Sequence, residues 1–472
     1  MVCVIVKKKY IMVIISFLLG VTFTYAAELI KAKEVSFSNG LSNLKANNVQ
    51  DAIEELYNKS ISDSSCKNVS APKLGEGLIP VTIDSDGIVT YADTSKEWYN
   101  YCDKRWANAV ILEDNTNYKV GDIISETDIQ SYFVWIPKYK YKLWNTGTAS
   151  EGVHEIEIIF DENNTEDVEG VSCKTPMLSG EAGNCDNGEY MTHPAFISMN
   201  TNGFWVGKFE TGYKGATSGA TAQVNANDTS KVIIKPNVYS WRNISVYNMF
   251  LNSYNYQRNL DSHMMKNTEW GAVAYLSHSK YGINREVNIN NNSSYKTGYS
   301  ALPSTNQQAY PGTYGDGETY NSTYNTKNGY KASITGNISG VYDMSGGTHE
   351  YMSSYITGKF GSSSFTTTSI ANYDNKYFDV YDASSAVNTY QYRILGDATG
   401  EMGPFKQFLD GDNKSRYHSS WYGDLSFFVE SIYPWLVRSG HYTHGELAGA
   451  FYFSRGIGEA ANDVGFRIVL TP

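Results

Sequence analysis

The sequence has few cysteines, and none lies in its second half. Five occur among 472 residues, and the last is Cys185. A cysteine nucleophile or a thiolate metal ligand is therefore excluded from the long C-terminal part. No GxSxG, P-loop or GxGxxG motif stands in a strand–helix context, so the common signatures of hydrolases and nucleotide-binding enzymes are missing as well.

Positive charge is also scarce. The chain has 38 Lys+Arg against 49 Asp+Glu, a net charge of -11, and no basic tract outside the N-terminus. Nucleic-acid binding needs clustered cations to neutralise phosphates, so nucleic acid is not the expected partner. What is abundant is tyrosine, with 38 residues beside many Asn, Ser and Gly. That mixture is typical of loop-built recognition surfaces, and also of tyrosine-rich β-proteins.

Residues 1–26 are predicted to be a signal peptide. Three lysines precede the apolar run IMVIISFLLGV, and Thr24 and Ala26 are the small residues that a signal peptidase needs. The run is shorter than the about 20 residues of a membrane span, which favours cleavage after Ala26 over a retained anchor. We therefore expect an extracellular or cell-surface protein that meets a membrane only through an uncleaved N-terminal segment.

Four cysteines remain after this cleavage, and an exported chain favours disulfides between them. Neighbours in sequence suggest Cys66 with Cys102 and Cys173 with Cys185, because each pair closes a modest loop. The segment PMLSGEAGN supplies Pro and Gly for a tight return between the second pair. The alternative is that some or all of the thiols stay reduced.

The exported chain is predicted to contain three parts. Residues 27–65 form a short helical stalk and linker, in which Asn47 or Asn48 caps a helix that packs on the rest of the chain or on copies of itself in a homo-oligomer. Residues 66–130 form a small β-rich module that includes a hairpin over LIPVTIDSDGIVTYAD. Residues 131–472 form the main domain.

Five segments of the main domain, in order, resemble the formylglycine-generating-enzyme (sulfatase-modifying factor) domain family. They are KFETG, MKNTEW, GVYDMSGGTHEYM, RSGHY and GFR. The resemblance implies an α+β, C-type-lectin-like fold with GFRIVL in its central sheet. The oxidase branch of that family uses paired cysteines in its C-terminal part, which this chain lacks. The resemblance therefore implies a non-catalytic member; the alternative is a metal-dependent oxidase or oxygenase of the same fold.

Arg467 is predicted to be a buried cation. It alternates with Phe466 and Ile468 in GFRIVL, as in a buried terminal strand with one ionic partner. We expect Asp343 or Glu350 to be that partner, in a structural role.

Residues 284–333 contain almost no aliphatic side chains. Such a segment is predicted to be a surface insertion held against the domain by its tyrosines. It is either a tolerated loop or a Tyr/Asn platform for a ligand such as a sugar, since aromatic faces and amides suit hydroxyl-rich ligands.

In the stretch from Trp435 to Leu470, apolar or glycine positions are interleaved with polar ones. The pattern predicts one set of residues that holds the fold and a second set that is free to face a ligand. It resembles the variable region of retroelement-diversified proteins of bacteria and prophages, which implies binding of a glycan or protein; the alternative is an ordinary loop of a lectin-like domain. Tyr452 and Arg455 are expected to point outward, and Phe451 and Phe453 inward. The predicted ligand contacts are His441, Tyr442, His444, Tyr452, Arg455, Asn462 and Asp463.

The histidines and the glutamate of this region are not expected to bind a metal ion. His441, His444 and Glu446 follow the pattern HxxHxE, but they lie in Gly-flanked loop sequence and no third histidine has a predicted place beside them. His349 is interpreted as a packed residue beside a buried acid. No cofactor is expected, and a structural calcium is left open, although Gly347 replaces an asparagine of the family motif.

Overall fold

The computed structural model divides the chain into two compact units, Met1–Ser64 and Ser65–Pro472. It describes residues 36, 48–53, 69–114, 116–143, 155–161, 167, 190–301, 322–381, 396–399, 406–409, 415–419, 422 and 424–472. The predicted signal peptide and the predicted disulfide between Cys173 and Cys185 lie outside these residues. Within the described ranges, no helix has both the length and the apolar character that a bilayer span requires.

The first unit contains the start of the predicted helix. Residues 49–53 are helical. The side-chain oxygen of Asn48 accepts a hydrogen bond from the backbone N–H of Asp51 (2.8 Å), and the Asn48 amide donates to the Asp51 carboxylate (2.7 Å). Asn48 is thus the N-cap, one of the two candidates that the sequence offered.

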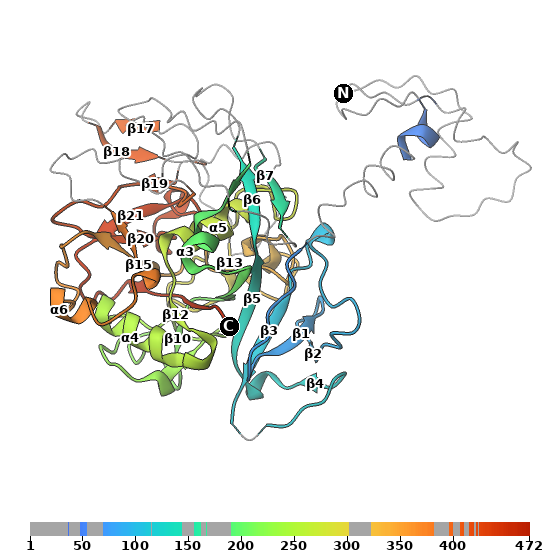
Figure 1. The fold of residues 1–472 in the computed structure, drawn as a ribbon, viewed down its shortest axis with the longest axis horizontal. Helices are drawn as coiled ribbons and strands as arrows, with labels where there is room; N and C mark the ends of the chain where they lie inside the picture. The colour runs from blue at the N-terminus through green and yellow to red at the C-terminus, as the bar shows by residue number, and fades with distance from the viewer. Residues whose placement is uncertain are drawn as a thin grey trace, which may run out of the picture. The chain divides into compact units, whose positions relative to one another are not determined.

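The second unit is built on an antiparallel sheet of eight strands in the order β12-β23-β9-β5-β3-β1-β2-β4 (Figure 1). The final strand, β23, pairs on both sides, so the prediction that GFRIVL lies in the central sheet is confirmed for its last three residues. Gly465 pairs instead with Glu350 in the second sheet. The strands are β1 (Ile79–Ile83), β2 (Val89–Tyr91), β3 (Asn108–Leu112), β4 (Ile123–Ile124), β5 (Ile129–Pro137), β9 (Gly203–Gly207), β12 (His263–Met264) and β23 (Ile468–Leu470).

The predicted boundary at residue 130 falls inside this sheet. The hairpin β1–β2 forms as expected, with Ile83 opposite Val89. However, β3 pairs with β5 along its length, and the Tyr101 hydroxyl donates to the Trp135 carbonyl (2.7 Å). Residues 66–130 are therefore not a separate module, because their strands complete the sheet of the main domain. Cys102 is disulfide-bonded, and its predicted partner Cys66 lies outside the described residues.

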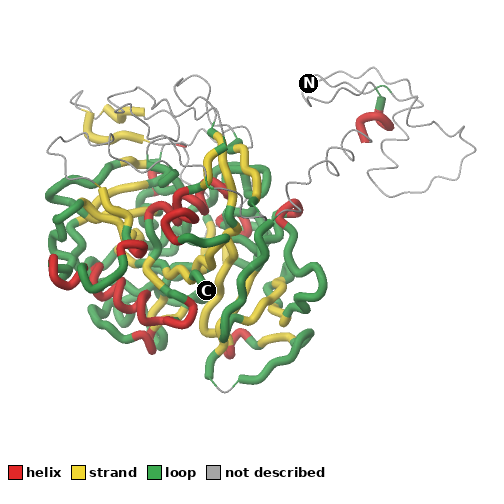
Figure 2. Tube along the Cα trace, viewed as in Figure 1, coloured by secondary structure: helices red, strands yellow, loops and turns green. Residues whose placement is uncertain are grey.

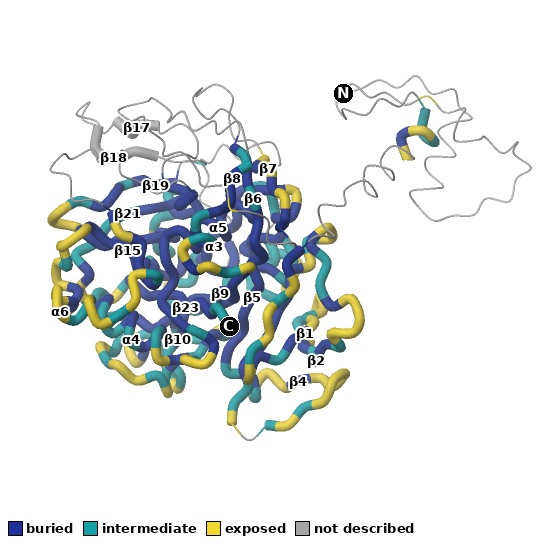
Figure 3. The backbone as a smooth tube through the Cα atoms, in the orientation of Figure 1, coloured by how far each residue is buried: buried dark blue, intermediate teal, exposed yellow. Residues whose placement is uncertain are grey.

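A second, mixed sheet has the order β16-β15-β20-β21-β19-β18-β17, with β22 paired to β15. Strands β15 and β20 of this sheet are buried almost throughout, as is β5 of the first sheet (Figure 3). The β15 strand runs antiparallel to β20 and parallel to β22. The strands are β15 (His349–Ile356), β16 (Asp379–Tyr381), β17 (Lys406–Leu409), β18 (Ser415–Ser419), β19 (Leu425–Ser426), β20 (Trp435–Arg438), β21 (Phe453–Gly456) and β22 (Val464–Gly465).

The unit is mixed and sheet-rich, with few helices among the described residues (Figure 2). The helices are α3 (Pro194–Met199), α4 (Val246–Tyr256), α5 (Asn267–Ser277) and α6 (Thr367–Ile370). Val246, Met249 and Phe250 lie on the buried face of α4, and α5 begins at Asn267. Three small sheets complete the strands: β6 (Tyr139–Lys142), β7 (Glu157–Phe160) and β8 (Met191–Thr192); β10 (Gly212–Tyr213) and β11 (Val232–Ile233); β13 (Tyr299–Ser300) and β14 (Ser322–Thr323).

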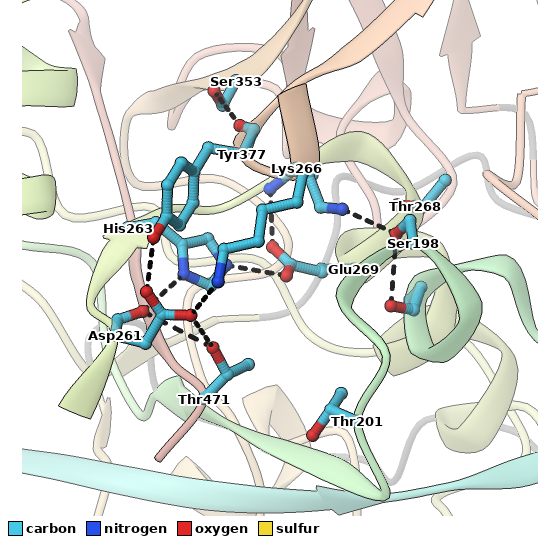
Figure 4. A network of polar contacts seen from close by, with 12 residues as sticks. Ser198, Thr201, Asp261, His263, Lys266, Thr268, Glu269, Ser353, Tyr377 and Thr471 are labelled. Atoms are coloured by element: carbon cyan, nitrogen blue, oxygen red, sulfur yellow. Dashed lines mark hydrogen bonds and ion pairs between the residues drawn. The ribbon is translucent and has the colours of Figure 1, made fainter. Parts of the chain in front are cut away.

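A buried polar network fixes the start of α5 (Figure 4). The Glu269 carboxylate accepts hydrogen bonds from the Lys266 backbone N–H and contacts His263 Nε2, both at 2.8 Å. Burial alone would raise the pKa of Glu269, but the nearby His263 and Lys266 lower it. Asp261 accepts from the Thr471 hydroxyl (3.1 Å), which ties the C-terminus to the same network. These partners give the network a structural role.

The predicted surface insertion is buried at both of its described ends. Asn288 and Asn290 are at most 1% exposed, and Ala332 is 3% exposed. The Asn290 amide donates to the Asp343 carboxylate (2.9 Å) and to the Lys296 carbonyl (2.8 Å). The expectation that the whole of 284–333 lies on the surface is therefore wrong, because side-chain amides replace aliphatic packing at these positions. Residues 302–321 lie outside the described ranges.

Arg467 is fully buried, as predicted, and joins the two sheets. It makes two hydrogen bonds to Glu350, from Nη2 to Oε1 (2.5 Å) and from Nε to Oε2 (3.0 Å), and it donates to the Gly207 carbonyl (2.8 Å). Asp343, the other predicted partner, accepts only through its backbone carbonyl (3.3 Å). Glu350 is thus the ionic partner.

The variant Arg467→Met should lower the free energy of unfolding by about 3–5 kcal/mol, because it leaves the buried Glu350 carboxylate without its cation. Chemical denaturation measures this change. Arg105→Ala is the control, since Arg105 and Glu97 pair at the surface with side chains 46% and 62% exposed, and its loss should change stability by about 1 kcal/mol or less. Equal effects of the two variants would contradict the assignment.

Candidate functional site

The candidate site lies where β15 begins and β20 ends. The two strands are antiparallel, with Glu350 opposite Arg438. His349, the first residue of β15, therefore lies near the loop that follows β20 and carries His441 and His444. The backbone N–H of His349 also donates to the Asp463 carbonyl (2.9 Å), just before β22. Segments far apart in sequence thus meet at one end of the second sheet.

A sharp turn aims this loop. Ser439 and Gly440 both have left-handed backbones, with φ of 74°. A Cβ on Gly440 would lie 2.9 Å from Ala448 Cα and 3.2 Å from Tyr452 Cδ2, so only glycine fits there. The Ser439 hydroxyl donates to the Gly346 carbonyl (2.7 Å). The loop is held in place by these bonds and by a 3.0 Å bond from Tyr442 N–H to the Gly347 carbonyl.

Three imidazoles converge in the space that results. The ring centroids of His349 and His441 are 4.8 Å apart, those of His349 and His444 are 4.9 Å apart, and those of His441 and His444 are 4.2 Å apart. One ring nitrogen of each lies within 4.8 Å of the others. We refer to His349, His441 and His444 as the histidine cluster. The side chain of Glu446, the third residue of the HxxHxE pattern, lies outside what the structure describes.

Two nitrogens of the histidine cluster lack hydrogen bonds. Nδ1 of His349 and Nδ1 of His444 are shielded from solvent and have no partner among the described residues. Burial, reinforced by His444 and His441, holds the pKa of His349 well below its ordinary value. Burial and the neighbouring His441 lower the pKa of His444 to about 4. The two rings are therefore neutral at physiological pH, and each unpaired nitrogen costs about 1–3 kcal/mol of desolvation.

Tyr452 forms the inner wall of the site. Its ring centroid lies 5.5 Å from that of His349 and 5.6 Å from that of His444, and the residue is only 1% exposed. The expectation that Tyr452 points outward is therefore wrong. Strand alternation does not apply to it, because β21 begins at Phe453 and the Tyr452 N–H donates to the Gly449 carbonyl in a turn (3.1 Å). Phe451 and Phe453 are buried, as predicted.

Arg455 is held by a different group of residues. Its guanidinium forms an ion pair with Glu430 (3.0 Å) and donates to the Phe428 carbonyl (3.1 Å). It also lies over the rings of Phe427 and Tyr433, at 5.3 and 5.4 Å. Arg455 was expected to be free, but its contacts fix it against the chain between β19 and β20.

The remaining predicted ligand contacts lie beside side chains that the sequence did not predict to be part of the site. The rings of Tyr442 and Tyr295 make an edge-to-face contact at 4.9 Å, and the Arg242 guanidinium lies 3.9 Å from the Tyr295 ring centroid. Arg242 also donates to the backbone carbonyl of Asn462, which is exposed. Burial lowers the pKa of His441, and the nearby Asp463 carboxylate opposes this shift. We call Arg242, Tyr295, Tyr442, Asn462 and Asp463 the Tyr442 face.

Sequence reasoning missed His349, Tyr295 and Arg242 as parts of the site. His349 reaches the site through the antiparallel pairing of β15 with β20, a long-range contact that has no local sequence signal. Tyr295 falls in the segment 284–333, whose tyrosines were proposed as a ligand platform. Arg242 had no signal of its own.

The variant Tyr452→Ala should lower the free energy of unfolding by about 3 kcal/mol or more, since it removes a fully buried aromatic ring. Tyr442→Ala, a half-buried tyrosine of the same loop region, should change stability by about 1 kcal/mol or less. Denaturant titration of both variants gives the comparison. A Tyr452→Ala protein as stable as the parent would place that ring at the surface instead.

No protein-family model matches the chain, and no curated protein sequence matches it. Among solved structures, Treponema denticola variable protein 1 is similar at 10% identity and a TM-score of 0.26, covering 76% of this chain and 99% of that protein. The Major Tropism Determinant I1 variant (11%, 0.25) and P3c variant (11%, 0.23) are similar over 86% of this chain and 97% of each of theirs. Structural similarities this distant do not indicate a function. The function is therefore inferred from the site itself.

Proposed function

We propose that this chain is a ligand-binding protein that recognises a glycan or a protein through the Tyr442 face and the adjoining histidine cluster. One observation carries the proposal: aromatic, imidazole and polar side chains from five separated segments meet at a single partly exposed place. The segments contain Arg242, Tyr295, His349, residues 441–444 and residues 462–463. A lectin-like scaffold, implied by the family resemblance, is part of this proposal.

The chemistry of the Tyr442 face suits such a ligand. Tyrosine rings offer large contact areas with little loss of conformational entropy, and their faces pack against sugar C–H groups or apolar side chains. The amide of Asn462 and the carboxylate of Asp463 supply hydrogen-bonding groups beside those rings. Arg242 is already held by the Gly219 carbonyl (2.6 Å) and by Asn462, so it supports Tyr295 in place.

We also propose that the protein is not an enzyme. No cysteine follows Cys185, so the thiolate chemistry of the oxidase branch has no residues to perform it in the part of the chain that carries the site. We further propose that the protein is exported and that the surface is diversified by a retroelement. The DNA beside the gene tests diversification, through a near-copy of its 3′ end that differs at adenines and lies next to a reverse transcriptase.

Binding to printed arrays of glycans and of extracellular protein domains tests the proposal. The parent protein should bind selected members, and Tyr442→Ala or Tyr295→Ala should weaken that binding at least about tenfold, the effect of about 1.4 kcal/mol at an aromatic contact. Tyr118→Ala is the control, a half-buried tyrosine that bonds to Asp128. Equal binding by the parent and both site variants, or no binding by the parent, would contradict the proposal.

A further inference from the structure

We propose that the histidine cluster is a metal site, which binds one Zn²⁺ or a similar divalent first-row transition ion through His349, His441 and His444. The sequence argued against a metal here because it offered no third histidine. The structure supplies that histidine from β15, a strand that precedes the other two ligands by more than ninety residues.

The donor set and its spacing suit this ion. Imidazole nitrogen is a preferred ligand of zinc, copper and nickel, whereas magnesium and calcium take oxygen. Three nitrogens at about 2.0–2.1 Å from a tetrahedral zinc lie about 3.3 Å from one another. The nitrogens of the histidine cluster lie within 4.8 Å of one another, so the rings need to close by roughly 1–1.5 Å, which side-chain rotation supplies.

The unpaired nitrogens are the independent observation. Buried polar atoms are nearly always hydrogen-bonded, yet Nδ1 of His349 and Nδ1 of His444 have no partner among the described residues. Two such atoms, on rings whose centroids lie 4.9 Å apart, are accounted for by an ion that accepts their lone pairs. A purely structural packing of three histidines leaves them unexplained.

The surroundings of the histidine cluster resemble those of a supported metal site. The Thr443 hydroxyl lies 2.9 Å from His441 Nδ1 and 3.3 Å from its Nε2, so it contacts the ring and can help to orient it. The Tyr452 ring packs behind His349 and His444, with its centroid 5.5 and 5.6 Å from theirs. The Asp463 carboxylate adds a negative charge near His441, which favours a bound cation.

Three protein ligands leave one position of a tetrahedral ion open. All three histidines are partly exposed, so water or a donor atom from a ligand can approach the cluster to fill that position. The metal site is part of the surface that is proposed to bind a ligand. Metal binding does not, however, require the glycan or protein to be present. Metal binding and ligand binding can therefore be tested separately.

The test uses the purified full chain, stripped of metal by dialysis against a chelator. Equilibrium dialysis with Zn²⁺ and elemental mass spectrometry should give one tightly bound ion per chain, and Co²⁺ should give the visible absorption of a four-coordinate site. The double variant His441→Ala/His444→Ala should bind at least about 100-fold more weakly, since loss of even an outer partner of a metal ligand costs roughly 10–100-fold.

Two further variants separate the possible failures. Tyr442→Ala should keep the Zn²⁺ site whatever it does to glycan or protein binding, because its ring is not a ligand. His349→Ala should also lose the metal, and thermal unfolding in the absence of zinc shows whether each variant is folded. Absence of a tight ion from the folded parent would overturn the metal site, as would equal zinc affinity of the parent and the folded double variant. Neither result would change the conclusion drawn from the glycan and protein arrays, which test ligand binding separately.

Discussion

The contact between Arg467 and Glu350 is the constraint on which the rest of the second unit depends. Arg467 lies directly before β23 of the first sheet, and Glu350 is the second residue of β15 in the other sheet, so their two hydrogen bonds join the sheets across the core. Arg467 also donates to Gly207 at the end of β9. His349 immediately precedes Glu350. The position of the first residue of β15, and thus of one third of the histidine cluster, follows from this buried pair.

Arg467 has more carboxyl groups around it than the one with which it pairs. The carboxyl groups of Glu210, Asp343 and Glu350 all lie near it in the core, and burial together with their mutual repulsion raises the pKa of Glu210 well above its ordinary value. Glu210 accepts from the Ser240 hydroxyl (2.6 Å) and the Thr348 backbone N–H (2.8 Å). A Cβ at Gly347 would lie 2.3 Å from Glu210 Oε1, and the backbone there is left-handed with φ of 69°, so this position needs glycine. A buried polar network of this kind favours a single arrangement of the strands that carry the site.

Local pattern predicted much of the fold. The hairpin β1–β2 and the burial of Arg467 follow from short stretches of sequence, whereas the choice of Glu350 over Asp343 as its ionic partner needed the structure. The domain boundary at residue 130 was wrong because β3–β5 pairing is a long-range contact without a local signature. Tyr452 was misplaced because β21 begins one residue after it. The histidine cluster was missed because it needs the pairing of β15 with β20, which only the assembled sheet provides.

The polar-bonded core of the second unit thus presents three imidazoles in an arrangement that suits a metal ion. Nδ1 of His349 and Nδ1 of His444 have no hydrogen-bond partner among the described residues, and burying such atoms unpaired costs free energy. The most direct measurement is anomalous diffraction at the zinc edge from crystals of the full chain soaked in Zn²⁺. The account predicts one strong peak about 2.0–2.1 Å from a nitrogen each of His349, His441 and His444. A map with no peak between these rings, in crystals where they keep the arrangement described, would contradict it.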